Sequence, residues 1–237
     1  RPRAAGGTGH ARSRNPGSPY AVNAAFQHIR DWVFDLDNTL YPARALYDEI
    51  GERMTAFIAR AAGASTDEAL FLREHYFHEY GATIVGLVRH HGIDAREFLA
   101  YVHDADLSVL TPDPELRDLI AALPGRRIVF TNGGGGHAER VLKRLQLDDL
   151  IEGVFDIEHA ELAPKPQRES YDRLIQVRGV RPDRAILVED TLRNLEPAHA
   201  MGFVTALVGP VHPDPRPAYV DHWADEVKTI LRVALGL

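Results

Sequence analysis

Short apolar runs alternate with helical repeats of apolar residues along the second half of the chain. The runs predict strands, and the amphipathic stretches between them predict helices. A strand, helix, strand order repeated in this way predicts an α/β fold, a Rossmann-like parallel sheet with helices on both faces. The predicted strands are 32–34, 127–131, 154–157, 185–189 and 203–208, and the predicted helices are 137–145, 168–178 and 194–201.

Residues 45–109 interrupt this alternation, because they contain no strand-like run and repeat apolar residues at helical spacing. Residues 65–68 and 94–97 are typical helix starts, since each places a capping residue before an acidic first turn. The chain therefore predicts a helical insertion at 45–109 within an α/β core formed by 28–44 and 110–237.

The two ends of the chain differ from this pattern. Residues 1–27 are rich in Arg, Gly, Pro, Ser and Ala and predict a disordered extension. Their basic residues would also suit an amphipathic targeting signal, but they lack the apolar centre of a secretory signal. Four prolines between 210 and 217 predict a loop, and 219–237 a closing helix.

Composition narrows the classes of function. The 237 residues are 45% hydrophobic, which suits a sizeable core, and their net charge of −7 argues against nucleic acid or an anionic membrane as partner. The chain has no cysteine, which excludes disulfides, zinc-thiolate sites and cysteine nucleophiles. No apolar run approaches the roughly 18 residues of a membrane span. We expect a cytoplasmic protein, either a monomer or a homodimer.

Two aspartates follow the first predicted strand. Because side chains alternate along a strand, Asp35 and Asp37 leave on the same side and lie close together. Two such charges repel unless one carboxyl stays protonated or a cation binds between them. Oxygen ligands favour Mg²⁺ over softer ions, so the pair predicts a magnesium site. An ordinary turn after the strand is the alternative, since Asp and Asn are common there.

Polar residues also follow the other predicted strands. Ligands bind beyond the carboxyl ends of the strands in such a sheet, so we expect these residues to share one pocket with the two aspartates. Each has an ordinary interpretation as a turn, a solvated lysine or a helix cap, but their occurrence together favours a functional site. They are Thr131 and Asn132, Lys165 between two prolines, and Glu189 with Asp190.

These motifs, in this order, resemble those of the haloacid dehalogenase-like phosphohydrolases, over about residues 31–208. The helical insertion resembles the cap that the helical-cap subfamily I carries after its first strand. A narrower resemblance, to the pyrimidine 5'-nucleotidases, rests on Tyr80-Gly81 and on residues 137–142 and 189–198. The run Gly133–Gly136 departs from the bulkier or basic residues expected of relatives at this place.

The resemblance implies hydrolysis through an aspartyl-phosphate. Asp35 would attack phosphorus, and Asp37 would protonate the leaving alkoxide and then deprotonate water. Thr131, the Asn132 backbone and Lys165 would bind the phosphoryl oxygens. The implied ligands of Mg²⁺ are the carboxylates of Asp35 and Asp190 and the backbone carbonyl of Asp37, with Glu189 orienting one of its waters. The dehalogenases of this superfamily lack an aspartate at the position of Asp37, so its presence favours phosphate esters.

The same resemblance implies a small phosphorylated metabolite as partner, specifically a pyrimidine nucleoside 5'-monophosphate. Aromatic residues of the insertion could contact the base, although aromatic residues at helical spacing usually pack in a core. They are Tyr76, Phe77, His78 and Tyr80. The alternatives are a sugar phosphate or phosphoglycolate as substrate, a phosphomutase that reuses the aspartyl-phosphate, and a binding module without catalysis.

Overall fold

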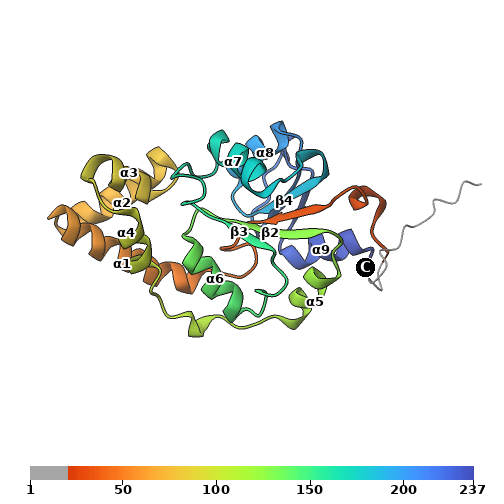
Figure 1. Ribbon diagram of the computed structural model, residues 1–237, viewed down its shortest axis with the longest axis horizontal. Helices are drawn as coiled ribbons and strands as arrows, with labels where there is room; N and C mark the ends of the chain where they lie inside the picture. The colour runs from red at the N-terminus through yellow and green to blue at the C-terminus, as the bar shows by residue number, and fades with distance from the viewer. Residues whose placement is uncertain (1–20) are drawn as a thin grey trace, which may run out of the picture.

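A parallel β-sheet with helices on both faces forms the centre of the protein, as predicted (Figure 1). The computed structural model describes residues 21–237. Within them the sheet has six strands in the order β3-β2-β1-β4-β5-β6. All paired neighbours run parallel. The strands are β1 (Asp31–Phe34), β2 (Arg126–Phe130), β3 (Gly153–Phe155), β4 (Ala185–Glu189), β5 (Val204–Val208) and β6 (His222–Ala224).

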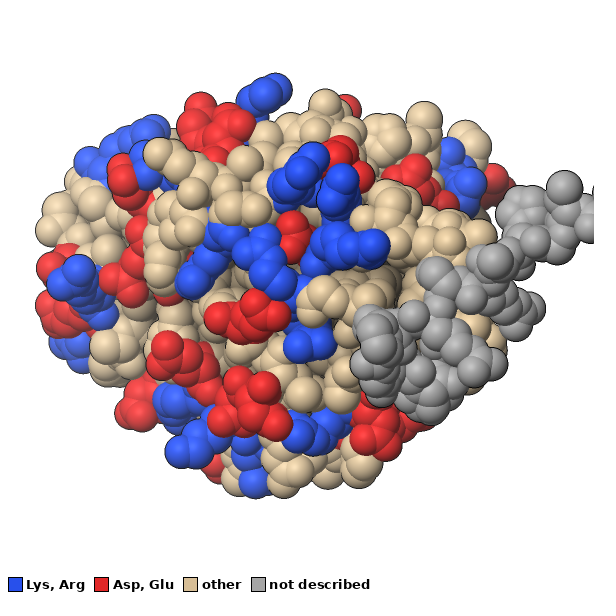
Figure 2. All heavy atoms as spheres, turned by 45° about the vertical axis from the view of Figure 1, so that its right-hand side comes forward, with Lys and Arg blue, Asp and Glu red and all other residues tan. Residues whose placement is uncertain are grey.

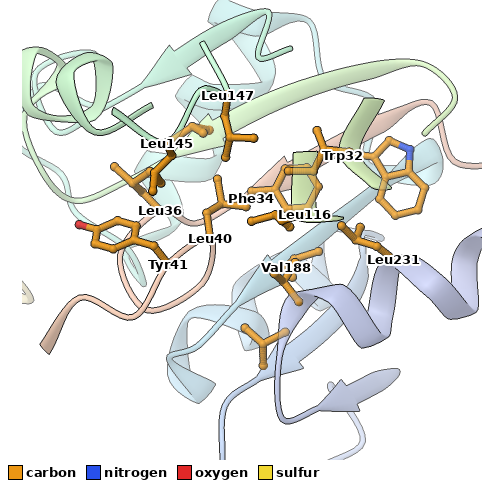
Figure 3. Close-up of a cluster of buried hydrophobic side chains, with 14 of the residues drawn as sticks. Trp32, Phe34, Leu36, Leu40, Tyr41, Leu116, Leu145, Leu147, Val188 and Leu231 are labelled. Carbon is orange, nitrogen blue, oxygen red and sulfur yellow. The ribbon is translucent and has the colours of Figure 1, made fainter. Parts of the chain in front are cut away.

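Two apolar layers, one on each face of the sheet, hold the helices in place. The first contains Trp32 and Phe34 of β1 and packs against one group of helices (Figure 3), while Val33 points into the opposite layer. A strand buried on both sides requires a continuous apolar run, which is what residues 32–34 supply. The first layer includes α5 (Pro114–Ala122), α6 (Gly135–Arg144) and α9 (Val227–Leu235), and the second includes α7 (Arg168–Arg178) and α8 (Leu192–Ala200).

The predicted helical insertion is a separate group of helices at one end of the molecule (Figure 1). Its start signals are confirmed, because Ser65 forms a capping box with Glu68 and Asp94 accepts a hydrogen bond from Glu97 N at 2.8 Å. Phe57 and Phe98 meet edge to face in its own apolar cluster. The helices are α1 (Arg44–Ala62), α2 (Thr66–Tyr80), α3 (Thr83–His91) and α4 (Ala95–Val102).

The predicted disordered extension is wrong for its last residues. Residues 1–20 lie outside the described residues, but Val22 and Phe26 are buried in the core, and Asn23 N donates to Ala234 O at 2.8 Å. Phe26 stacks on Trp32 with ring centroids 6.1 Å apart. One pair of large apolar residues, with Asn23 and two alanines between them, is too short a pattern to establish a periodicity, so the sequence pattern missed this contact.

The sequence pattern also missed two elements, one near the carboxyl end of the chain and one before β2. The strand β6 has only three residues, and the helix α5 begins at Pro114 after the cap residue Asp113. Short segments with polar neighbours provide too few positions for a period to be recognised.

None of the helices within residues 21–237 is both long and apolar enough to cross a bilayer. The face in Figure 2 carries Lys and Arg interspersed with Asp and Glu.

Gly86 of α3 allows the insertion to pack closely. A Cβ at this position would lie 2.1 Å from Cγ of the Tyr76 ring, which is far inside van der Waals contact. We expect Gly86→Ala to lower the free energy of unfolding by about 1–3 kcal/mol. The matched control is Gly136→Ala in α6, where the added Cβ meets nothing within 4 Å and helix propensity is expected to stabilise by about 0.5–1 kcal/mol. Urea denaturation of both variants measures the difference, and equal effects would contradict this packing argument.

Candidate active site

The predicted site residues converge at the carboxyl edge of the sheet. Phe34 of β1 lies in register with Val129 of β2 and Val188 of β4, so the residues that follow these strands share one edge. Lys165 arrives from the loop before α7, and its ammonium is buried under this edge. The positions of the residues that follow these strands are thus set by strand register rather than by local sequence.

Lys165 occupies the centre of the site. Its Nζ donates to Asp35 Oδ1 at 2.7 Å, to Glu189 Oε2 at 2.7 Å and to the Phe130 carbonyl at 2.8 Å. Burial disfavours the ammonium, but the two carboxylates outweigh burial and raise the pKa of Lys165. The lysine is therefore charged at neutral pH and uses all three of its donors within the protein.

The carboxylates around Lys165 outnumber its single positive charge. Burial, followed by repulsion from Glu189, raises the pKa of Asp35 to about 7 despite the opposing effect of Lys165. Burial also raises the pKa values of Glu189 and Asp190. A buried group of acids with surplus negative charge is stabilised either by protonation or by a cation.

Three of these carboxylates could hold that cation. One oxygen each of Asp35, Glu189 and Asp190 lies within 4.8 Å of the others. Glu189 is the least suited of the three, because Oε2 already accepts from Lys165 and Oε1 accepts from Thr191 N at 3.1 Å. The all-oxygen donor set, with its surplus of negative charge, fits a hard divalent ion such as Mg²⁺. Asp35 and Asp190 would then be the direct carboxylate ligands of such an ion.

Asp37 has a different environment from Asp35. Tyr41 donates its hydroxyl to Asp37 Oδ1, and His137 Nε2 lies 3.5 Å from the same oxygen. Burial alone would raise the pKa of Asp37, but these contacts outweigh burial and lower it. Neither Tyr41 nor His137 was among the predicted site residues. The only signal for His137 was its place in the stretch 137–142 that resembles the pyrimidine 5'-nucleotidases.

Thr131 and Asn132 form the loop that follows β2. The Asn132 side chain bridges to the loop of Lys165, because its Nδ2 donates to Lys165 O at 3.1 Å and its Oδ1 accepts from Lys165 N at 2.8 Å. Thr131 Oγ1 accepts from Gly133 N at 2.9 Å. Both residues line the cavity of the site. The side-chain amide of Asn132 fixes the position at which the Lys165 backbone enters the site.

A cavity of about 1200 Å³ extends from these residues to the helical insertion. Phe77 and His78 of α2 line it, whereas Tyr80 does not, since its hydroxyl instead meets His90 Nε2 at 2.7 Å. Tyr76 is buried and contacts His91. Lining residues that were not predicted include Tyr47, Arg73, His103, Arg193 and Asn194.

Arg193 links the two sides of this cavity. Its guanidinium lies 5.4 Å from the ring centroid of Phe77, so a residue of α8 in the core contacts α2 of the insertion. Phe77 is nonetheless 47% exposed. The lining of the cavity therefore combines an aromatic ring with a cation.

His103 lies near Asp37 and His137, and we expect it to make the protein sensitive to acid. Burial, together with the nearby His137, lowers the pKa of His103 to about 3. A histidine whose pKa is depressed on folding stabilises the fold above its unfolded pKa of about 6.5, and this stability is lost as the pH falls below that value. Between pH 7 and pH 5 we expect the free energy of unfolding of wild type to fall by roughly 1–2 kcal/mol more than that of His103→Phe. The ring is only partly buried, so this difference is smaller than the full shift in pKa would give. Urea denaturation at both pH values tests this, and parallel losses would contradict it.

Comparison with known proteins relates this arrangement to characterised families. The family model described as "Hydrolase: haloacid dehalogenase-like hydrolase" matches residues 32–202. Phosphate metabolism protein 8 of Saccharomyces cerevisiae is 32% identical over 136 residues, a match that covers 52% of this chain and 42% of that protein. Enolase-phosphatase E1 of Zygosaccharomyces rouxii is 32% identical over 78 residues, 33% of each chain. The match thus spans less than half the length of either curated relative.

Solved structures share the fold across most of the chain. L-2-haloacid dehalogenase from Xanthobacter autotrophicus superposes with a TM-score of 0.57 at 18% identity, covering 88% of this chain and 99% of that chain. The HAD phosphatase from Thermococcus onnurineus gives a TM-score of 0.58 at 18% identity, with 88% and 98% covered. At this level of identity the likeness concerns the fold, because one fold hosts several chemistries.

Proposed function

The chain belongs to the haloacid dehalogenase-like hydrolase family, and from this premise we propose that it is a Mg²⁺-dependent phosphomonoesterase. The buried contact of Lys165 with Asp35 and Glu189, next to Asp37, is the observation that carries the proposal. In the proposed domain organisation, residues 45–109 are a helical cap, and 28–44 with 110–237 are the catalytic core. The cavity between the two parts supports this division.

Asp35 is the proposed nucleophile. An oxygen of its carboxylate attacks phosphorus in line, the bond from phosphorus to the leaving oxygen breaks, and an aspartyl-phosphate remains. Lys165 favours the ionised form of Asp35 for this step and offsets the negative charge that the phosphoryl group brings. Thr131 and the backbone of Asn132 are proposed to bind phosphoryl oxygens, since both residues line the cavity.

Asp37 is the proposed acid and base. In its protonated form Asp37 gives its proton to the leaving alkoxide, and the resulting carboxylate then takes a proton from the water that hydrolyses the aspartyl-phosphate. A haloacid dehalogenase would not need this proton transfer, because halide leaves without a proton. The presence of Asp37 at the cavity therefore supports phosphate ester hydrolysis over cleavage of a carbon–halogen bond.

Mg²⁺ fits the carboxylates of this site. Asp35 and Asp190 are the proposed carboxylate ligands, with the backbone carbonyl of Asp37, and Glu189 stays outside because both its oxygens accept hydrogen bonds from the protein. The ion would neutralise the surplus negative charge and polarise the phosphoryl group. Without it, the three carboxylates, of which Asp35 and Glu189 are buried, would repel both one another and the dianionic substrate.

A pyrimidine nucleoside 5'-monophosphate is the proposed substrate. The cavity of about 1200 Å³ exceeds what a phosphate needs, which leaves room for a nucleoside. Phe77 and Arg193 offer an aromatic face and a cation, and both suit a planar base. Tyr80, predicted from sequence as a further contact, is proposed only to support α3 through His90.

Phosphate release from a panel of esters tests this function. The panel contains UMP, CMP, dTMP, AMP, GMP, phosphoglycolate and sugar phosphates, each with Mg²⁺ and with EDTA. We expect release from pyrimidine monophosphates at least about tenfold faster than from the other esters, and loss of release in EDTA, because a hard cation is needed at the carboxylates. Release from phosphoglycolate or sugar phosphates alone would retain the mechanism and reject the nucleotide. No release from any ester would reject the phosphatase.

A further inference from the structure

The glycine run after β2 provides the surface on which one side chain of the helical insertion rests. His103 follows α4 as its C-cap residue. A Cβ added to Gly134 would lie 3.4 Å from His103 Nδ1, and one added to Gly133 would lie 3.9 Å from His103 Nε2. A first side-chain atom would already touch the ring, so any larger side chain would displace it. The run Gly133–Gly136, which departs from the bulkier or basic residues expected there, therefore leaves the space that the His103 ring occupies.

The position of His103 is fixed from two sides. Arg140 Nη1 of α6 donates to the His103 carbonyl at 2.8 Å. The His103 ring stacks on the ring of His137, with centroids 4.5 Å apart and an interplanar angle of 19°. His137 is 3% exposed and lies in the first turn of α6. The insertion thus contacts α6 through two parallel rings.

His137 passes this contact on to Asp37. Its Nε2 lies 3.5 Å from Asp37 Oδ1, the same oxygen that accepts from the Tyr41 hydroxyl. Within residues 21–237, His137 Nδ1 has no hydrogen-bond partner, and the ion-pair contact of the ring is made by Nε2 to Asp37. Because both contacts are made to Oδ1, the other oxygen of Asp37 stays available for proton transfer.

We propose that His103 and His137 are positioning residues that orient Asp37, so that its proton-transferring oxygen is correctly placed when the helical insertion is docked on the core. The proposal rests on the proposed function, because only hydrolysis of an ester requires Asp37 to protonate a leaving group. If the insertion separates from the core, His103 leaves the glycine run, His137 loses its stacking partner, and Asp37 is less firmly held.

The dependence on the leaving group tests this proposal. An alkyl phosphate such as UMP needs a proton from Asp37 when its alkoxide leaves, whereas 4-nitrophenolate leaves without one. Single-turnover formation of the aspartyl-phosphate isolates the step in which this proton moves. We expect His137→Leu to slow that step at least about tenfold with UMP and less than about twofold with 4-nitrophenyl phosphate, while KM changes little.

Conservative variants separate positioning from folding. His137→Gln keeps a nitrogen donor near the place of Nε2 and is expected to recover most of the rate lost in His137→Leu. His103→Ala removes the stacked ring and is expected to slow the reaction of UMP about fivefold, whereas His103→Phe keeps a ring and recovers most of this loss. His28→Ala, an exposed histidine outside the cavity, is the control for surface substitution. Thermal unfolding of each variant shows whether it is folded. If His137→Leu does not fold, the His103 variants still test the proposal.

Two results would overturn the proposal while leaving the proposed function in place. Equal slowing with both esters would mean that the histidines do not act through Asp37. A raised KM with an unchanged single-turnover rate would mean that they bind substrate instead. A wild type that hydrolyses neither ester would reject the proposed function, and with it the inference.

Discussion

Asp35→Asn is expected to reduce phosphate release by a factor of about 10³ or more while the protein stays folded. Asparagine has nearly the same shape and keeps an oxygen that accepts from Lys165 Nζ, but its amide cannot form the aspartyl-phosphate. Burial and Glu189 raise the pKa of Asp35 to about 7, so removing the charge also relieves repulsion. The melting temperature without Mg²⁺ should therefore be unchanged or raised.

Rapid quenching with a phosphate-labelled substrate would show the intermediate directly. Wild type should accumulate acid-stable label on the protein within one turnover, and Asp35→Asn should not. Asp172→Asn is the matched control, because Asp172 is an exposed carboxylate on α7 that pairs only with Arg168. Label on Asp35→Asn, or full activity in this variant, would assign the nucleophile to another group.

The convergence of the site could be predicted from the sequence because it follows from the sheet. Strand register brings the residues after β1, β2 and β4 to one edge whatever the loops do, and β1 was readable as a buried strand from the continuous apolar run at residues 32–34. The family's motifs then indicated Lys165, whose loop carries no periodicity.

The side of the cavity that the helical insertion forms could not be predicted in the same way. Phe77 and Tyr80 are three positions apart on α2, yet Phe77 lines the cavity and Tyr80 turns to His90 of α3. That difference depends on how α2 is rotated against α3, and a helical repeat gives the spacing of residues but not this rotation. His103 and His137 meet across 34 positions through the ends of two helices, and no sequence period reports such a contact.

Lys165→Met is expected to have the second large effect, on stability as well as on activity. Methionine fills similar space but leaves Asp35 and Glu189 buried without the ammonium that now bonds to both at 2.7 Å. Removing one partner of a buried ion pair costs about 3–5 kcal/mol, so the free energy of unfolding at pH 8 in EDTA should fall by about that amount. Phosphate release should be lost, because the buried ammonium that is proposed to offset the phosphoryl charge is removed.

The pH dependence of this loss would identify its electrostatic origin. Burial already raises the pKa values of Asp35 and Glu189, and removing Lys165 raises them further. An acid with a raised pKa in the folded state retains its full stability below its unfolded pKa of about 4 and loses stability as the pH rises. The deficit of Lys165→Met relative to wild type should therefore be largest at pH 8 and shrink towards pH 5.

A double variant separates unpaired charge from lost packing. In Lys165→Met, adding Asp35→Asn removes one of the two unpaired carboxylates, so part of the lost stability at pH 8 should return, although Asp35→Asn alone has little effect in wild type. Lys143→Met, at an exposed position of α6, is the control for replacing lysine by methionine. If the deficit is equal at pH 5 and pH 8 and the double variant recovers nothing, Lys165 stabilises the fold by packing. If the deficit shrinks and the second substitution restores stability, the lysine is held in place by the same charges that the proposed reaction needs.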